Sequence, residues 1–171
     1  RYLAVTGVQT CALPIYAIAD EVERKEDAVD HYEDVLGTYL VKLSAKHLST
    51  DDNRTINTLL HTIGDFERVS DHAVNLIKTA EEIRDKSIQF SEEALGDLGV
   101  LEAAVQDIVN RTVDAFQKGD VYAAGKIEPL EQVVDGLVRE VKTRHIARLQ
   151  AGVCTIEYGF VLDDLLTNYE R

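Results

Sequence analysis

The sequence predicts an all-α protein built as an antiparallel helical bundle. Only two of its 171 residues are proline, and alanine, leucine, glutamate and lysine, which favour helix over strand, are abundant. Apolar residues recur every three or four positions through most of the chain, as expected for helices that bury one face. These observations argue against an all-β fold.

Composition and charge limit which molecules the protein can bind and where it can act. The formal net charge of −13 argues against nucleic acid as a direct partner, because binding a phosphate backbone needs a basic face. The two cysteines, Cys11 and Cys154, form neither a disulfide framework nor a ligand cluster, so we expect a reducing compartment. No apolar run approaches the ~20 residues of a transmembrane helix. We therefore expect any membrane anchor to lie outside this sequence.

The two ends of the sequence differ from its middle. Arg1–Ile15 has no helical period and resembles a translated sequencing-adaptor artefact, so we set residues 1–15 aside as a non-native leader. At the other end the helical pattern reaches Arg171 without a stop signal. We expect a fragment that is open at both ends.

Three helical segments are expected in the first part of the chain. The first covers about residues 17–47, and the cap-type residues 49–52 end its turn and open the second, which reaches about Lys86. Ser91 opens the third segment. That segment stops at Gly119, because glycine suits the left-handed position just past a helix end.

Two further segments follow. Asp120 caps a fourth segment that continues to about Gln150, and Thr155 opens a fifth. Pro129 lies inside the fourth segment, so it should either kink that helix or mark its true start. The linkers between all five segments are short, which predicts antiparallel neighbours.

Glu-x-x-x-Asp pairs recur in one register of the helical pattern. Glu67 occupies a position whose neighbours one heptad away, Leu60 and Val74, are apolar, and Asp71 follows one turn later. The same register recurs in the first, fourth and fifth segments. The carboxylates in this register are Glu26 and Asp30, Glu67 and Asp71, Glu131 and Asp135, and Glu170, whose aspartate would fall past the end of the sequence.

These pairs also indicate an internal repeat. Glu131 follows Glu26 at nearly the same separation as Glu170 follows Glu67. We therefore predict one complete three-helix unit over residues 16–118. Residues 119–171 would form a second, equivalent unit that is truncated inside its second helix.

Clustered carboxylates have two competing explanations. Acidic side chains gathered across a helix pair repel one another and lose hydration, unless protons, arginines or a cation compensate. Oxygen ligands suit magnesium, calcium, manganese or iron, whereas zinc generally needs nitrogen or sulfur as well, which His72 offers. Arg24, Arg68 and Arg171 offer ordinary ion pairs instead. Both the metal-site and the ion-pair interpretations stay open.

Three segments resemble a known family. IGDFERVSDHAVNLIKTAEEI (Ile63–Ile83), RHIARLQAGVC (Arg144–Cys154) and FVLDDLLTNYER (Phe160–Arg171) resemble the PhoU-like domain found C-terminally in bacterial sodium/phosphate cotransporter family proteins. The resemblance covers nearly everything after Tyr16. Its most specific part is the ER-x-x-DHA-x-N core over Glu67–Asn75.

The resemblance implies both a fold and a function. It implies two three-helix bundles whose Glu/Asp-x-x-x-Asp motifs bind iron or zinc clusters, and it assigns metal binding to the seven carboxylates named above. Together with the preference for oxygen ligands, the expected divalent or trivalent ion is iron, zinc, magnesium or manganese. The domain would be a non-catalytic, cytoplasmic regulator of phosphate transport. Its partner would be a membrane transporter domain, in the same full-length chain, or other transport machinery, and a homodimer is also allowed. A missing N-terminal transporter domain would associate it with the inner or plasma membrane.

Two other functional classes are alternatives to this one. A carboxylate-bridged metalloenzyme in a helical bundle would use glutamate and histidine from facing helices. The sequence has neither the Glu-x-x-His pattern of di-iron bundles nor a nucleophile–base pair or a phosphate-binding glycine loop. The other alternative is a structural helical interaction module without a metal site. We predict no catalytic residue and no enzyme.

Overall fold

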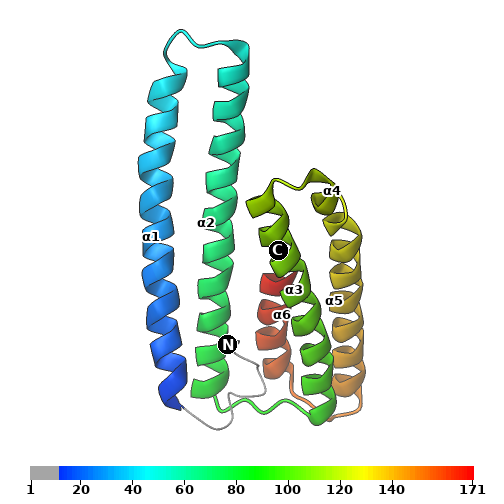
Figure 1. The fold of residues 1–171 in the computed structure, drawn as a ribbon. Helices are drawn as coiled ribbons and strands as arrows, with labels where there is room; N and C mark the ends of the chain where they lie inside the picture. The colour runs from blue at the N-terminus through cyan, green and yellow to red at the C-terminus, as the bar shows by residue number, and fades with distance from the viewer. Residues whose placement is uncertain (1–11) are drawn as a thin grey trace. The chain divides into compact units, whose positions relative to one another are not determined.

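The computed structural model describes residues 12–171, with side chains from residue 18 onward. This range divides into two compact units, Ala12–Lys78 and Thr79–Arg171, so helix α2 contributes to both. Every regular element in it is a helix, which confirms the all-α prediction (Figure 1). Across these residues no helix combines the length and the apolar character needed to span a bilayer.

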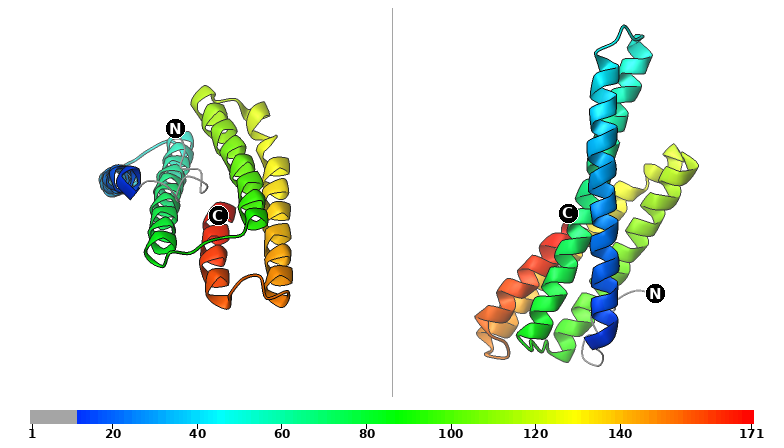
Figure 2. Two further views of the ribbon diagram at one scale, coloured as in Figure 1. Left: turned by 90° about the horizontal axis from the view of Figure 1, so that it is seen from below. Right: turned by 90° about the vertical axis from the view of Figure 1, so that its left-hand side faces the viewer.

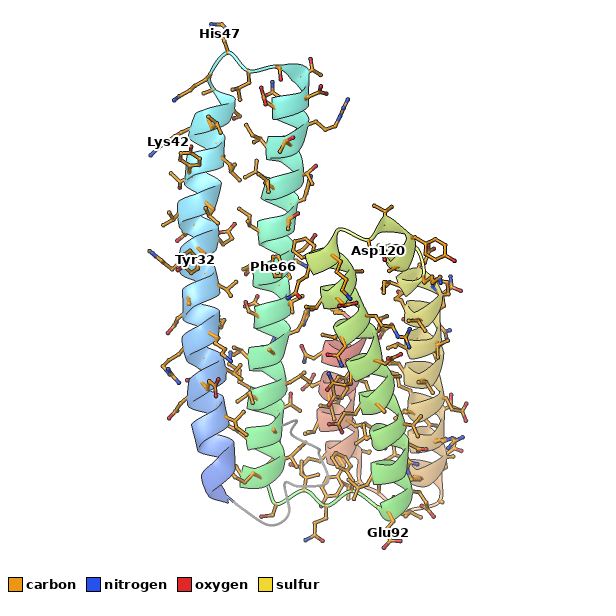
Figure 3. All side chains as sticks on the ribbon, viewed as in Figure 1. Tyr32, Lys42, His47, Phe66, Glu92 and Asp120 are labelled. Carbon is orange, nitrogen blue, oxygen red and sulfur yellow. The ribbon has the colours of Figure 1, made fainter. Side chains whose placement is uncertain are left out.

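The first unit is a long helical hairpin. Helix α1 covers Ala12–Ser44 and helix α2 covers Thr50–Asp85. The two helices run side by side in opposite directions, and the connection that carries His47 closes one end of the hairpin (Figures 2 and 3). The buried apolar side chains of this unit are Ala19, Leu40, Ile56, Val74 and Ile77.

The start of α2 agrees with its predicted caps. The Ser49 hydroxyl accepts a 3.1 Å hydrogen bond from the Asp52 N–H, and the Ser49 N–H donates to the Asp52 carboxylate at 3.2 Å. This reciprocal arrangement satisfies two backbone donors that would otherwise lack a partner at the helix start. The preceding helix ends at Ser44, slightly before the predicted residue 47.

Helix α1 begins earlier than predicted. The sequence places its start at about residue 17, whereas the helix begins at Ala12. Residues 12–15, which we set aside as part of a leader, are therefore helical. The rest of that predicted leader, residues 1–11, lies outside the described residues.

The second unit combines the end of α2 with four further helices. These are α3 (Glu92–Lys118), α4 (Val121–Ala124), α5 (Ile127–Gln150) and α6 (Ile156–Glu170). Helix α3 packs against α4 and α5, and α5 packs against α6. The most deeply buried side chains belong to this unit: Leu98, Leu101, Val138, Val161, Leu162 and Leu166.

Local signals fix most boundaries in this unit as predicted. The Ser91 hydroxyl accepts a 3.2 Å hydrogen bond from the Ala94 N–H at the start of α3. Gly119 ends that helix in the left-handed conformation, with φ of 62°, which glycine adopts without steric cost. Thr155 caps α6 by accepting from the Tyr158 N–H at 3.4 Å.

The prediction of a single fourth helix from Asp120 to Gln150 is wrong. Asp120 caps the short helix α4, accepting a 2.9 Å hydrogen bond from the Ala123 N–H, and α5 starts separately at Ile127. Pro129 lies in the first turn of α5, where its missing N–H removes no helical hydrogen bond. Proline therefore marks the true start of the helix, one of its two predicted effects.

The predicted domain boundary stays a prediction. We expected one three-helix unit over residues 16–118 and a truncated second unit over residues 119–171. The two compact units of the structure divide within α2, between Lys78 and Thr79, and this division does not test the predicted repeat.

Candidate carboxylate site on the α1–α2 hairpin

Two predicted glutamates lie in the seam where α1 and α2 face each other. Glu26 and Glu67 are both half-buried. The residues one heptad from Glu67 follow the same pattern, since Leu60 is half-buried and Val74 is buried. The heptad register in the sequence therefore placed Glu67 in the correct stripe.

The two predicted aspartates lie at the rim of this seam. Asp30 follows Glu26 by one turn of α1, Asp71 follows Glu67 by one turn of α2, and both aspartates are exposed. The hairpin thus carries two half-buried carboxylates, each with an exposed carboxylate one turn away.

Electrostatics show that the charges on the two helices affect one another. The pKa of Glu67 is raised above its ordinary value, first by loss of hydration and then by the negative charges of Asp71, Asp30 and Glu33. A hydrogen bond between the side chains of Glu67 and Asp71 adds to this rise, because it favours the protonated form. Residues of α1 and α2 therefore form one carboxylate cluster.

Glu26 shows the same effect from the other helix. Loss of hydration raises its pKa most, followed by the charges of Asp30, Asp27 and Asp71. The ammonium group of Lys78 partly offsets this rise. Each predicted glutamate of the hairpin thus interacts with both predicted aspartates.

Glu33 also belongs to this cluster, although it was not among the predicted carboxylates. It is half-buried on α1, one heptad after Glu26, and its charge raises the pKa of Glu67. The signal was present in the sequence as a second glutamate at the same heptad position of the seam. It was missed because Glu33 has no aspartate four residues later.

The ion-pair explanation fails for two of the three arginines considered. Arg24 donates from Nε to the backbone carbonyl of Asp20 at 3.1 Å. Arg68 pairs with Asp65, with 3.8 Å between Nη1 and Oδ1. Both guanidinium groups are therefore directed to partners outside the predicted cluster.

The carboxylates do not form a ready-made metal site. Among the described residues, no three histidine, cysteine, aspartate or glutamate side chains are arranged to hold a metal ion. The cluster is close enough for mutual repulsion, yet its oxygens do not converge on one point. A cation would bind only after side-chain rotation, which is open to the exposed Asp30 and Asp71.

The second predicted set lies on α5 and α6. Glu131 is exposed in the first turns of α5, and Glu170 is exposed at the end of α6. Asp135 is half-buried and lies 4.0 Å from the guanidinium of Arg139. Asp135 thus has an arginine beside it, whereas Arg24 and Arg68 of the α1–α2 hairpin are directed away from the predicted carboxylates.

One ion pair gives the relative register of α5 and α6. Lys142 pairs with Asp163 across the two antiparallel helices, with 2.8 Å between Nζ and Oδ1. Following both helices from this pair brings Glu170 level with the turn that holds Asp135.

Comparisons with known proteins find similarity to the PhoU domain. Residues 16–80 match the model of the PhoU domain family. The chain is also 21% identical over 126 residues, 72% of its length, to the phosphate-specific transport system accessory protein PhoU homolog of Clostridium acetobutylicum. That alignment covers 56% of the relative, so the chain spans about half the length of this curated protein. No solved structure gives a significant match to the chain. The match to the PhoU domain model thus lies on the hairpin that carries the carboxylate cluster, whereas the alignment to the clostridial relative is longer than the hairpin and extends beyond it.

Proposed function

We propose that this chain is a non-catalytic regulatory domain of phosphate transport. The proposal rests on one observation: the PhoU-domain match and the predicted carboxylates lie in the same part of the chain. The stretch that matches the PhoU domain, residues 16–80, is also the stretch that gathers Glu26, Asp30, Glu67 and Asp71. The name of the clostridial relative assigns that protein an accessory role in a phosphate-specific transport system, which supports the same role here.

Metal binding by the hairpin carboxylates is the second part of the proposal. The raised pKa values of Glu26 and Glu67 support it, because a cation would compensate for their lost hydration and for the repulsion by neighbouring carboxylates. The donors are all carboxylate oxygens, which favours magnesium, manganese or iron over zinc. Glu131, Asp135 and Glu170 would supply a second, weaker site on the α5–α6 hairpin.

The proposed partner is a membrane transporter domain or the transport machinery itself. The resemblance of Ile63–Ile83 to domains of the sodium/phosphate cotransporter family supports this partner. In this proposal the domain acts on the cytoplasmic side of the membrane. Cation occupancy of the hairpin would alter how strongly it engages the transporter.

Phosphate uptake by intact cells tests the regulatory role. Cells that produce the chain should reduce uptake when external phosphate is plentiful, whereas cells without it should not. Substituting Glu67→Gln together with Asp71→Asn should abolish this response. The matched control substitutes Asp51→Asn and Asp65→Asn, two exposed aspartates of the same helix. Uptake that is the same with and without the chain would contradict the proposal.

A further inference from the structure

Cys154 lies in the short connection between α5 and α6, which the proposed function does not use. Gly152 follows the end of α5 in the left-handed conformation, with φ of 70°. The Val153 N–H donates to the Arg148 carbonyl at 3.0 Å, which turns the chain back toward the last turns of α5. Cys154 comes directly after this turn and directly before Thr155, the cap residue of α6. The turn thus brings the thiol back to the side of α5.

The thiol meets a buried histidine of α5. Sγ of Cys154 lies 3.8 Å from Nδ1 of His145, close enough for a hydrogen bond that involves sulfur. His145 is only 8% exposed, and within the described part of the chain no hydrogen-bond partner reaches its other ring nitrogen, Nε2. The imidazole is therefore a buried polar side chain whose polar contact is the thiol.

The imidazole is uncharged. Burial, followed by the charge of Arg148, lowers the pKa of His145, which favours the neutral form of the ring. A neutral imidazole has one bare nitrogen, and in the tautomer that carries the ring proton on Nε2 this is Nδ1. His145 can therefore accept the thiol proton of Cys154, which an imidazolium could not do.

Helix α6 contributes to the site in two ways. An added Cβ at Gly159 would be 2.8 Å from Nε2, so the His145 ring packs directly against the backbone of this helix. The thiol lies just before the first turn of α6, where the free N–H groups of a helix start favour negative charge developing on sulfur. A proton acceptor held beside a thiol at a helix start is an arrangement that activates cysteine as a nucleophile.

Access to the thiol favours small reagents. Cys154 is a free, half-buried cysteine, whereas its neighbours Val153 and Thr155 are exposed. Limited exposure of this kind favours a molecule of few atoms over a bulky disulfide. Hydroperoxides are small oxidants that convert such thiols to sulfenic acids.

We propose that Cys154 is a site of oxidation by small hydroperoxides, with His145 as the proton acceptor. Nδ1 takes the proton from Sγ, the sulfur attacks one oxygen of the peroxide, and the O–O bond breaks. The departing oxygen takes the proton from the imidazolium, so the thiol and hydrogen peroxide give a sulfenic acid and water. The sulfur loses two electrons and the peroxide gains two. This inference does not depend on the proposed role in phosphate transport.

The rate of oxidation by hydrogen peroxide tests this site. Cys11 is replaced by serine in every protein, so that Cys154 is the only thiol measured. A peptide of residues 151–157 contains Cys154 without His145 and gives the reference rate. The folded chain should lose its thiol about tenfold faster than the peptide, or more. Dimedone, which reacts with sulfenic acids, should label Cys154, and mass spectrometry locates the label.

Substitution of the histidine separates proton transfer from loop packing. His145→Asn keeps a hydrogen-bonding group near the position of Nδ1 but removes the proton acceptor, so oxidation should slow to about the rate of the peptide. Loosened packing would instead expose the thiol and raise the rate. The matched control is His61→Asn, at an exposed histidine of α2, which should leave the rate unchanged. Circular dichroism checks that each variant stays helical.

Two outcomes would overturn the proposal. One is a folded chain whose Cys154 is oxidised no faster than the peptide. The other is a His145→Asn variant that is oxidised as fast as the unaltered chain or faster, because the imidazole would then not be the acceptor of the thiol proton.

Discussion

Arg148 donates a 2.8 Å hydrogen bond from Nη1 to Oδ2 of Asp97, and the two side chains are only 11% and 10% exposed. Arg144 donates to the other carboxylate oxygen at 2.7 Å. One carboxylate of α3 thus holds two guanidinium groups of α5. The Nε and Nη2 atoms of Arg148 are buried without a hydrogen-bond partner, so its charge depends heavily on Asp97.

Removing Asp97 should therefore destabilise the second unit strongly. Breaking a buried ion pair from one side costs about 3–5 kcal/mol, because the remaining charge stays buried. We expect this loss in the free energy of unfolding of Asp97→Ala, measured by urea denaturation. Asp107→Ala is the control. Asp107 forms a solvent-exposed ion pair with Arg111 at 2.8 Å, so its removal should lower the free energy of unfolding by under about 1 kcal/mol. Equal losses of unfolding free energy in the two variants would contradict a larger contribution from the buried ion pair.

Two glycines of the α5–α6 hairpin should respond in opposite ways to alanine. Gly159→Ala would place a methyl group 2.8 Å from the buried His145 ring and should cost about 1–3 kcal/mol through overpacking. Gly136→Ala, in the interior of α5 with open space around its added Cβ, should stabilise by about 0.5–1 kcal/mol. Thermal unfolding of both variants measures the difference. A Gly159→Ala variant as stable as Gly136→Ala would mean that the His145 side chain moves aside freely.

The carboxylate cluster should make the hairpin more stable as pH falls. The pKa of Glu67 is raised on folding, so its ionised form is penalised in the folded state, and this penalty disappears as pH falls through the raised pKa. Glu67→Gln should therefore melt at a higher temperature than the unaltered chain at neutral pH. It should also gain less when the pH is lowered to about 5.

Glu21, in the same unit, should change stability with pH in the opposite direction, because its pKa is lowered. A hydrogen bond and the charge of Lys25, 2.7 Å away, lower its pKa, so its contribution to stability is present at neutral pH and lost in acid. Glu21→Gln should slightly lower the melting temperature at neutral pH, and the difference should vanish in acid. Identical pH profiles for Glu67→Gln and Glu21→Gln would contradict the assigned shifts.

The features that the sequence predicted correctly are local ones. The caps at Ser49, Ser91 and Thr155 and the stop at Gly119 depend on residues within one turn, and the structure confirms them. The seam position of Glu67 follows from heptad spacing alone. The start of α5 was predicted only as one of two possible effects of Pro129, because a proline inside a helical pattern can either kink a helix or begin one.

Features that depend on distant residues were not predictable in the same way. Asp97 meets Arg148 only because α3 packs against α5, and nothing in the local pattern of either helix indicates the other. The division of the chain within α2 likewise depends on tertiary packing. Glu33 and Glu67 lie on different helices. Predicting that they interact requires knowing which turn of α1 lies beside which turn of α2, and neither helix shows this by itself.

Cation binding by the α1–α2 hairpin is tested most directly by calorimetric titration of the chain with manganese. Three proteins are compared: the unaltered chain, the variant with Glu67→Gln and Asp71→Asn, and the control with Asp51→Asn and Asp65→Asn. We predict stoichiometric binding to the unaltered chain and the control, and binding about tenfold weaker or worse to the Glu67 and Asp71 variant. Absence of binding, or equal binding by all three proteins, would contradict a cation site at these carboxylates.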